Sequence, residues 1–340
     1  MRVRFLGVSV LLLSCSLSFA GCVAGPGEDL EDAGDGEEVA SSGQAVSTTG
    51  FTTHFRTWLA ANGYEPAYNL VRDDLSGGSY GGKASDADKV TKQPVIFVHG
   101  NSDKAVGTGV AGQTGWNASI EHFLANGYKT SELYATTWGP ASASLAAAQY
   151  HSKTYVMKTR KLVEAVLAYT GAAKVDIVAH SMGVTLARKA ILGGWANDAL
   201  DGGDYYIGAP LTSSVDTFVG IAGANRGLTS CYLSGPSTPT CGSTNGLYPG
   251  YLLGLAVVGR SSFLNDLMAQ SKFEGAYRYS IFSTVDEIIG YGGLVYGEYT
   301  ARLPGQTGEK KYTAYPYGHY NSKDLTASVQ LAMAASHTVP

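Results

Sequence analysis

Two kinds of hydrophobic pattern alternate along most of the chain. Short continuous apolar runs, which are typical of buried β-strands, occupy residues 94–98, 133–138, 175–178, 217–222 and 277–283, with a less regular one at 311–315. Between these runs, apolar residues recur at helical spacing over 51–62, 116–126, 152–169, 184–192 and 322–335. The 152–169 helix should bury the face that carries Tyr155, Leu162, Val166 and Tyr169, with Lys158 and Lys161 elsewhere. Residues 70–93 are polar and glycine-rich, so we expect them to be irregular.

The alternation of strands and helices predicts an α/β fold with a mostly parallel sheet and helices on both faces. Ligand sites in such sheets form beyond the carboxyl ends of the strands. Four candidate residues come just past predicted strand ends, namely His99, Ser181, Asp286 and His319. The sequence therefore predicts one site at this edge of the sheet.

More than fifty residues separate the strands at 217–222 and 277–283, which is too many for a plain crossover. This segment predicts a cap or loop insertion. Its apolar run at 247–258 has two interpretations. It either covers the active site as a cap suited to a lipid or polyester surface, or forms a buried helix that packs on the sheet.

The N-terminal segment has the pattern of an export signal. A basic start, Met1 to Arg4, precedes an apolar run from Phe5 to Leu13, which is too short and wrongly flanked for a spanning helix. Residues 1–21 are therefore predicted to be a signal peptide. Ala20-Gly21-Cys22 resembles a lipobox, in which Cys22 would carry a lipid and anchor the protein to a membrane; ordinary cleavage and secretion is the alternative.

Residues 22–50 are predicted to be a disordered linker. Seven acidic residues lie within 28–38, and Ser, Thr and Gly dominate the remainder, so too little apolar surface is available to offset the ordering entropy. Without residues 1–46 the chain carries 22 basic and 21 acidic residues and no basic cluster, which argues against nucleic acid as a partner. Residues 51–340 are long enough for one catalytic α/β domain, which we expect to be monomeric.

Only two of the four cysteines, Cys231 and Cys241, lie outside the export signal. They are ten residues apart in a loop rich in Gly, Pro, Ser and Thr. In an exported protein this pair predicts a disulfide, with a free buried pair as the alternative. The sequence gives no sign of a metal site or an organic cofactor.

The segment 175–192 predicts a strand, a sharp turn and a helix, with Ala179-His180-Ser181-Met182-Gly183 at the turn. A serine between small residues at such a corner is the pattern of a nucleophile elbow, because larger side chains would collide with neighbouring backbone. Ala179 stands where glycine is more common, and a methyl group still fits. Ser181 is therefore the predicted nucleophile.

A serine nucleophile needs a base that is oriented by a carboxylate, and in α/β-hydrolases these follow in the order Ser, acid, His. Of the two histidines after Ser181, His337 lies near the chain end, where we expect fraying, so His319 is the predicted base. Asp286 is the predicted acid because it follows a core strand, with Glu287 as the alternative. The acids that we set aside lie in a predicted surface turn, before a strand or in a helix: Asp198, Asp201, Asp204, Asp216 and Asp266.

The oxyanion hole needs two backbone N–H groups. We expect them from Met182, which follows the nucleophile, and from Asn101 in the loop after the 94–98 strand. His99 and His180 are expected to shape the site. The other histidines, His54, His122 and His151, have no motif around them.

These motifs together resemble the class 2 lipases of the α/β-hydrolase fold. The resemblance rests on Val-His-Gly-Asn-Ser-Asp at 98–103, Ala-His-Ser-Met-Gly-Val at 179–184 and the blocks 222–228 and 239–243. Among such enzymes these blocks are most similar to extracellular poly(3-hydroxybutyrate) depolymerases that attack native granules. The resemblance implies the triad Ser181, Asp286 and His319 with Asn101 and Met182 as oxyanion donors.

The predicted activity is hydrolysis of carboxylic esters. A lipase or esterase that acts on lipid or short-chain acyl esters is the first hypothesis, and a polyhydroxyalkanoate depolymerase is the second. Tyrosines near the predicted acid and base, which offer an apolar face and a polar tip, suit either substrate surface. A catalytically inactive binding protein and an amidase are further alternatives.

Overall fold

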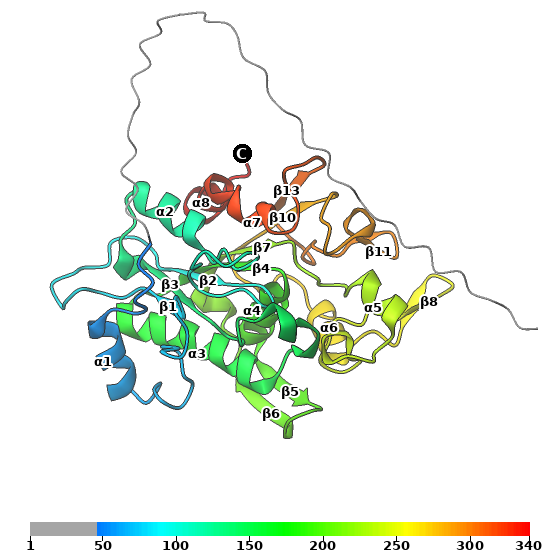
Figure 1. The fold of residues 1–340 in the computed structure, drawn as a ribbon, viewed down its shortest axis with the longest axis horizontal. Helices are drawn as coiled ribbons and strands as arrows, with labels where there is room; N and C mark the ends of the chain where they lie inside the picture. Colours follow the sequence, from blue (N-terminus) through cyan, green and yellow to red (C-terminus); the bar gives the residue numbers. More distant parts are fainter. Residues whose placement is uncertain (1–45) are drawn as a thin grey trace, which may run out of the picture. The chain divides into compact units, whose positions relative to one another are not determined.

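A seven-stranded sheet runs through the middle of the protein, as the computed structural model shows (Figure 1). The structure describes residues 46–340. The predicted signal peptide at 1–21, Cys22 and residues 23–45 of the predicted linker lie outside the described residues. Val46 is buried, and the Thr48 carbonyl accepts a hydrogen bond from the Gly77 N–H, so ordered structure begins before residue 51.

The sheet is parallel except at one edge. Its spatial order is β1-β3-β2-β4-β7-β10-β13, and only β1 runs antiparallel to its neighbour. The strands are β1 (Ser79–Tyr80), β2 (Val95–Val98), β3 (Leu133–Thr136), β4 (Val175–His180), β7 (Val215–Ile221), β10 (Tyr277–Ser283) and β13 (Gly308–Tyr312). Because β2, β4, β7 and β10 lie side by side, their carboxyl ends meet at one edge. The predicted α/β fold with a mostly parallel sheet is confirmed.

Helices cover both faces of the sheet, as the alternation of buried residues along β2 requires. Ile96 and Val98 belong to a core cluster that includes residues of α1, α3, α4 and α6, whereas Val95 and Phe97 belong to a second cluster with residues of α2 and α8. The helices are α1 (Thr53–Ala61), α2 (Asn117–Ala125), α3 (Lys153–Thr170), α4 (Met182–Leu192), α5 (Thr229–Ser234), α6 (Ser262–Met268), α7 (Asn321–Asp324) and α8 (Ala327–Ser336). None of the helices within residues 46–340 is long and apolar enough to cross a membrane.

Several 3₁₀ turns and three hairpins lie outside the sheet. The turns are η1 (Thr130–Glu132), η2 (Ala143–Ala148), η3 (Thr212–Ser214), η4 (Pro239–Cys241) and η5 (Tyr291–Gly293). The hairpins are β5 (Gly194–Asp198) with β6 (Gly203–Gly208), β8 (Tyr251–Leu253) with β9 (Ala256–Val258), and β11 (Leu294–Val295) with β12 (Glu298–Tyr299).

Two details of the predicted helices are wrong. The segment 322–335 is divided between α7, which ends at Asp324, and α8, which begins at Ala327. Between them, the Thr326 hydroxyl donates to the Ser322 carbonyl. Lys158 is buried in α3, although we placed it away from the apolar face; burial lowers its pKa to about 8.

The insertion between β7 and β10 contains α5, η4, the β8–β9 hairpin and α6. Of the two interpretations of the run at 247–258, the buried helix is wrong, since residues 251–258 form an exposed hairpin. The connecting helix is instead α6, which buries Phe263, Leu264 and Leu267 in the core cluster that includes α4.

Candidate active site

Ser181 lies at the sharp corner between β4 and α4, as the elbow pattern predicts. Its φ of 54° and ψ of −128° place it in a region that residues other than glycine rarely adopt. Gly183 permits the close crossing of α4 over the end of β2, because a Cβ at this position would lie 2.3 Å from the His99 carbonyl oxygen. The strained turn leaves Ser181 partly exposed at the carboxyl edge of the sheet.

The structure brings the predicted nucleophile, base and acid into one hydrogen-bonded row. Ser181 Oγ lies 3.0 Å from His319 Nε2, and His319 Nδ1 lies 2.8 Å from Asp286 Oδ2. When the neutral ring carries its proton on Nδ1 and donates a hydrogen bond from it to the carboxylate, Nε2 can accept the serine proton. His319 and Asp286 are both buried, so this chain of groups is shielded from water on the side away from Ser181.

The Asp286 carboxylate is held by the turn that follows β10. Its Oδ1 accepts hydrogen bonds from the backbone N–H groups of Ile288, at 3.0 Å, and Ile289, at 2.8 Å, which leaves Oδ2 directed at His319. Glu287, the alternative acid, accepts from the His319 backbone N–H at 2.9 Å and not from its ring. Both neighbouring carboxylates therefore fix His319, one through the imidazole and one through the backbone.

The acids that we set aside serve other parts of the structure. Asp198 is fully buried, and not in a surface turn as expected, because its carboxylate accepts from the Lys153 backbone N–H at the start of α3. Asp216 pairs with Lys174 and His337, and Asp266 pairs with Lys189. None of these pairs involves Ser181 or His319.

His180 joins the elbow to the loop that carries the base. Its Nε2 donates to the His319 carbonyl at 3.1 Å, and the two ring centroids lie 4.7 Å apart. Burial lowers the pKa of His180 well below its ordinary value, and the adjacent His319 lowers it further. A neutral His180 avoids repelling His319 when the latter gains a proton.

The loop after β2 lies against the elbow. A Cβ on Gly100 would lie 2.9 Å from both Ser181 Cβ and His180 Nδ1. The backbone N–H groups of Asn101 and Met182 have no hydrogen-bond acceptor within residues 46–340. These two N–H groups are therefore available as donors, one from the residue after Ser181 and one from the residue after Gly100, which lies against Ser181.

His99 shapes this loop, as we expected. Its Nδ1 donates to the Gly100 carbonyl at 2.7 Å, while Nε2 accepts from the Trp138 backbone N–H at 3.0 Å. The Trp138 indole N–H donates back to the His99 carbonyl at 2.8 Å, and the two rings stack. Burial lowers the pKa of His99 to about 4, so the imidazole is neutral near pH 7.

A buried ion pair that we did not predict ties the same loop to the histidine loop. Lys323 Nζ donates to Asp103 Oδ2 at 2.8 Å, and the two side chains are 0% and 1% exposed. Asp103 Oδ1 accepts from the backbone N–H groups of Lys104 and Gly115. The only features of the sequence that could have indicated this ion pair are the aspartate in the 98–103 motif and the lysine four residues after His319.

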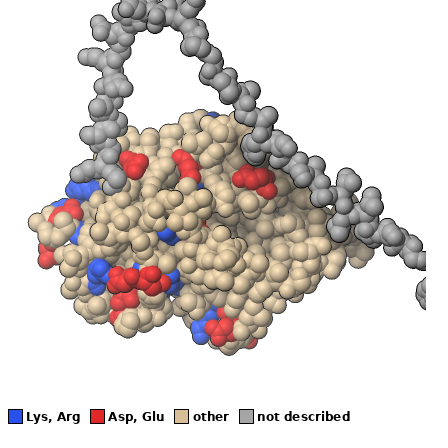
Figure 2. Space-filling model, viewed as in Figure 1, with Lys and Arg blue, Asp and Glu red and all other residues tan. Residues whose placement is uncertain are grey.

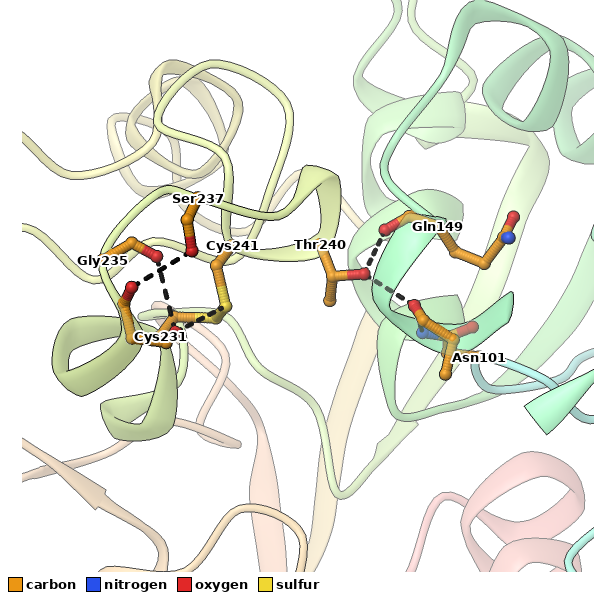
Figure 3. Close-up of a disulfide and its surroundings, with 9 residues drawn as sticks. Asn101, Gln149, Cys231, Gly235, Ser237, Thr240 and Cys241 are labelled. Carbon is orange, nitrogen blue, oxygen red and sulfur yellow. Dashed lines mark hydrogen bonds between the residues drawn. A yellow bond between two sulfur atoms is a disulfide. The ribbon is translucent and has the colours of Figure 1, made fainter. Parts of the chain in front are cut away.

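Cys231 and Cys241 form the predicted disulfide, with Cα atoms 5.0 Å apart (Figure 3). Next to it, Thr240 donates its hydroxyl to the carbonyls of Gln149 and Ala146, the latter at 2.7 Å. The Ala146 carbonyl also accepts from Asn101 Nδ2 at 3.0 Å. Figure 3 shows Thr240 between the disulfide and the side that carries Asn101 and Gln149. The disulfide loop therefore contacts the candidate oxyanion loop through one shared carbonyl.

The remaining histidines lie in other hydrogen-bonded sites. His337 does not fray, because its ring stacks on Tyr277 and its Nε2 lies 3.0 Å from Asp216. His151 is buried against Phe263, and its Nδ1 donates to the Asn245 carbonyl. His54 contacts the Tyr169 hydroxyl.

Comparison with known proteins identifies the family. The family model for lipase (class 2) matches residues 92–332, a range that contains Ser181, Asp286 and His319. No curated protein sequence matches the chain.

The chain is similar to solved lipase structures at low sequence identity. Lipase B of Aspergillus fumigatus has 16% identity and a TM-score of 0.51, with 80% of this chain and 59% of the lipase covered. This chain therefore spans less than two thirds of that enzyme. The mature lipase BlEst2 of Bacillus licheniformis has 14% identity and a TM-score of 0.44, with 75% and 96% covered. The closeness to polyhydroxybutyrate depolymerases stays a prediction. Since the family model covers most of the chain, this protein belongs to the class 2 lipase family of α/β-hydrolases.

Proposed function

We propose that this protein is an exported serine hydrolase of carboxylic esters. The observation that carries the proposal is the row of hydrogen bonds from Ser181 Oγ through His319 to Asp286, with distances of 3.0 and 2.8 Å. Membership of a lipase family makes an ester the first choice of substrate. The disulfide agrees with an oxidising compartment, as does the predicted export signal at 1–21.

In the proposed mechanism, His319 Nε2 takes the Ser181 proton while Oγ attacks the ester carbonyl carbon. The N–H groups of Asn101 and Met182 bind the oxyanion of the tetrahedral intermediate. Collapse of this intermediate breaks the bond to the alkoxide, which leaves with the proton from His319. Water then gives a proton to His319 and attacks the acyl-serine carbonyl carbon. The second tetrahedral intermediate collapses by breaking its bond to Ser181 Oγ, which takes the proton back from His319, and the acid is released.

The substrate is proposed to be a lipid or short-chain acyl ester. A polyhydroxyalkanoate is the second candidate, favoured by the blocks at 222–228 and 239–243. Initial rates on tributyrin emulsion and on amorphous polyhydroxybutyrate granules separate the two. A rate on granules that exceeds the rate on tributyrin would favour the depolymerase.

A fluorophosphonate probe tests the chemistry directly. We expect the full chain to be labelled and Ser181→Ala to lose the label while its circular dichroism stays unchanged. Tyr320→Phe is a matched control, since the Tyr320 ring lies beside His319 without a hydrogen bond to it. Folded protein that takes up no label would refute the hydrolase and leave a binding protein as the alternative.

Export and the lipid anchor at Cys22 are proposed from the sequence alone. Expression of the full gene in a bacterium, with metabolic labelling by a radioactive fatty acid, tests the anchor. Loss of label in Cys22→Ala supports it, whereas a mature protein in the medium that begins after residue 20 supports simple secretion.

A further inference from the structure

The β8–β9 hairpin is the largest apolar projection among the exposed residues of the insertion. Leu255 at its tip is fully exposed, and Leu253 and Leu252 are 71% and 52% exposed. Leu252 and Leu253 are consecutive strand residues, so they point to opposite faces of the hairpin. Both faces of the tip are therefore bare, whereas a hairpin that belongs to a packed core buries one face.

The composition of this hairpin is uniform. From Leu247 to Gly259 the chain has no charged residue and no polar side chain except the tyrosine hydroxyls. The first charged residue after this stretch is Arg260, at the base of the hairpin. Figure 1 shows the hairpin at the outer end of the insertion, beyond α5, and the part of this end visible in Figure 2 carries no Lys, Arg, Asp or Glu.

Tyrosines surround the base of the hairpin. Tyr251 packs edge-on against Tyr232 and Tyr248, with ring centroids 5.8 and 5.6 Å apart. The Tyr296 hydroxyl donates to the Gly250 carbonyl, which ties the first strand of the hairpin to the β11–β12 region. These contacts attach the base of the hairpin to the domain, and the exposed tip extends from it.

We infer that the hairpin inserts its leucine tip into the apolar phase of an aggregated, uncharged ester and so holds the enzyme at the substrate surface. The proposal rests on the proposed ester hydrolysis. Aliphatic side chains at the tip and the exposed tyrosines Tyr232 and Tyr251 at the base match the polarity change across an oil–water boundary, where tyrosine places its ring in the apolar layer and its hydroxyl in water.

A fluid ester phase fits this shape better than a protein partner. The tip is convex and can enter a fluid, whereas a protein would need a groove of matching form. It also offers no charge or side-chain amide through which a protein partner would be selected. Because the hairpin projects from the outer end of the insertion, we assign it the role of an anchor.

The decisive variant is Leu253→Ser/Leu255→Ser, compared with Leu200→Ser. Leu200 is 63% exposed in the turn between β5 and β6, so it is an exposed leucine comparable to Leu253 but outside the hairpin. Flotation with triolein droplets, in the Ser181→Ala background, measures binding without turnover. We expect the double variant to partition into the droplet layer about 100-fold less, because each of the two buried leucines contributes a factor of about ten or more. The control should bind as the parent does.

The same substitutions in the active enzyme connect binding to turnover. Hydrolysis of triolein droplets should fall by the same factor, while hydrolysis of dissolved p-nitrophenyl butyrate should stay within about twofold. Unchanged flotation of the double variant would overturn the inference, as would an equal loss on both substrates. A dimeric parent that becomes monomeric in the double variant would assign the tip to a second copy instead. Hairpin-dependent flotation of a protein that hydrolyses neither ester would refute the proposed function alone.

Discussion

Replacement of Lys323 by methionine should test how the two loops of the candidate site are held together. Lys323 and Asp103 are almost completely buried, with Nζ and Oδ2 2.8 Å apart. Methionine fills a similar volume but leaves the Asp103 carboxylate buried with only two backbone N–H donors. Breaking one partner of a buried pair costs about 3–5 kcal/mol, so we expect Lys323→Met to lower the free energy of unfolding by that amount.

The double variant Asp103→Asn/Lys323→Met removes both charges. Asparagine keeps an oxygen that can accept from the Lys104 and Gly115 N–H groups, so no uncompensated charge remains. We expect the double variant to be more stable than Lys323→Met by about 2–4 kcal/mol. Asp324, 3.3 Å from Lys323 Nζ, is partly exposed and should change this balance little.

Urea unfolding followed by tryptophan fluorescence measures these differences, and Trp116 reports locally because Lys323 Nζ lies 5.4 Å from its ring centroid. Lys161→Met is the control, since Lys161 pairs with Glu164 on the helix surface and should cost less than about 1 kcal/mol. The reasoning fails if Lys323→Met lowers the free energy of unfolding no more than this control does. It also fails if the loss of free energy in the double variant equals the sum of the losses in the two single variants.

Three further outcomes are expected. Gly183→Ala places a Cβ 2.3 Å from the His99 carbonyl oxygen and should reduce kcat by about 100-fold or more, whereas Gly139→Ala, which meets nothing within 4 Å, should leave kcat unchanged in ester assays. His99 and His151 both have a pKa of about 4 in the folded state against an ordinary 6.5, so the unfolded chain binds protons first and the free energy of unfolding should fall as the pH drops from about 6.5 to 4. His151→Gln should reduce the slope of the free energy of unfolding against pH by one proton in urea titrations, and an unchanged slope would contradict this. Thr240→Val should lower kcat about tenfold with little change in KM, while Thr240→Ser should retain it; a change in KM alone would argue against a link to the oxyanion loop.

The sequence predicted the sheet and the row of candidate residues because both follow from local patterns and chain order. The strand at 277–283 has the predicted bounds, and Ser181 and Asp286 follow the ends of β4 and β10. The last strand is Gly308–Tyr312 and not 311–315, so His319 lies farther from its end than predicted, just before α7. Elimination sufficed for His319, since only one other histidine follows Ser181.

Pairings between distant residues were not predictable in this way. Nothing in the periodicity of α7 indicates that Lys323 reaches Asp103, 220 residues earlier, or that Glu287 binds the backbone of His319 and not its ring. The run at 247–258 left a cap and a buried helix open as alternatives, and the buried helix rested on the rule that continuous apolar character predicts burial. An exposed apolar hairpin is an exception to that rule, and such exceptions occur where a surface contacts something other than water.

The carbonyl of Ala146, shared by Thr240 and Asn101, has a consequence for how the enzyme matures. Thr240 is adjacent to Cys241, so its position depends on the disulfide as well as on its own hydrogen bonds. A newly synthesised chain with two free thiols would have the same Ser181, His319 and Asp286 but a less constrained Asn101 loop. Turnover should then rise when the thiols oxidise, and an enzyme still in a reducing cytoplasm would be slow towards the esters of the cell that makes it.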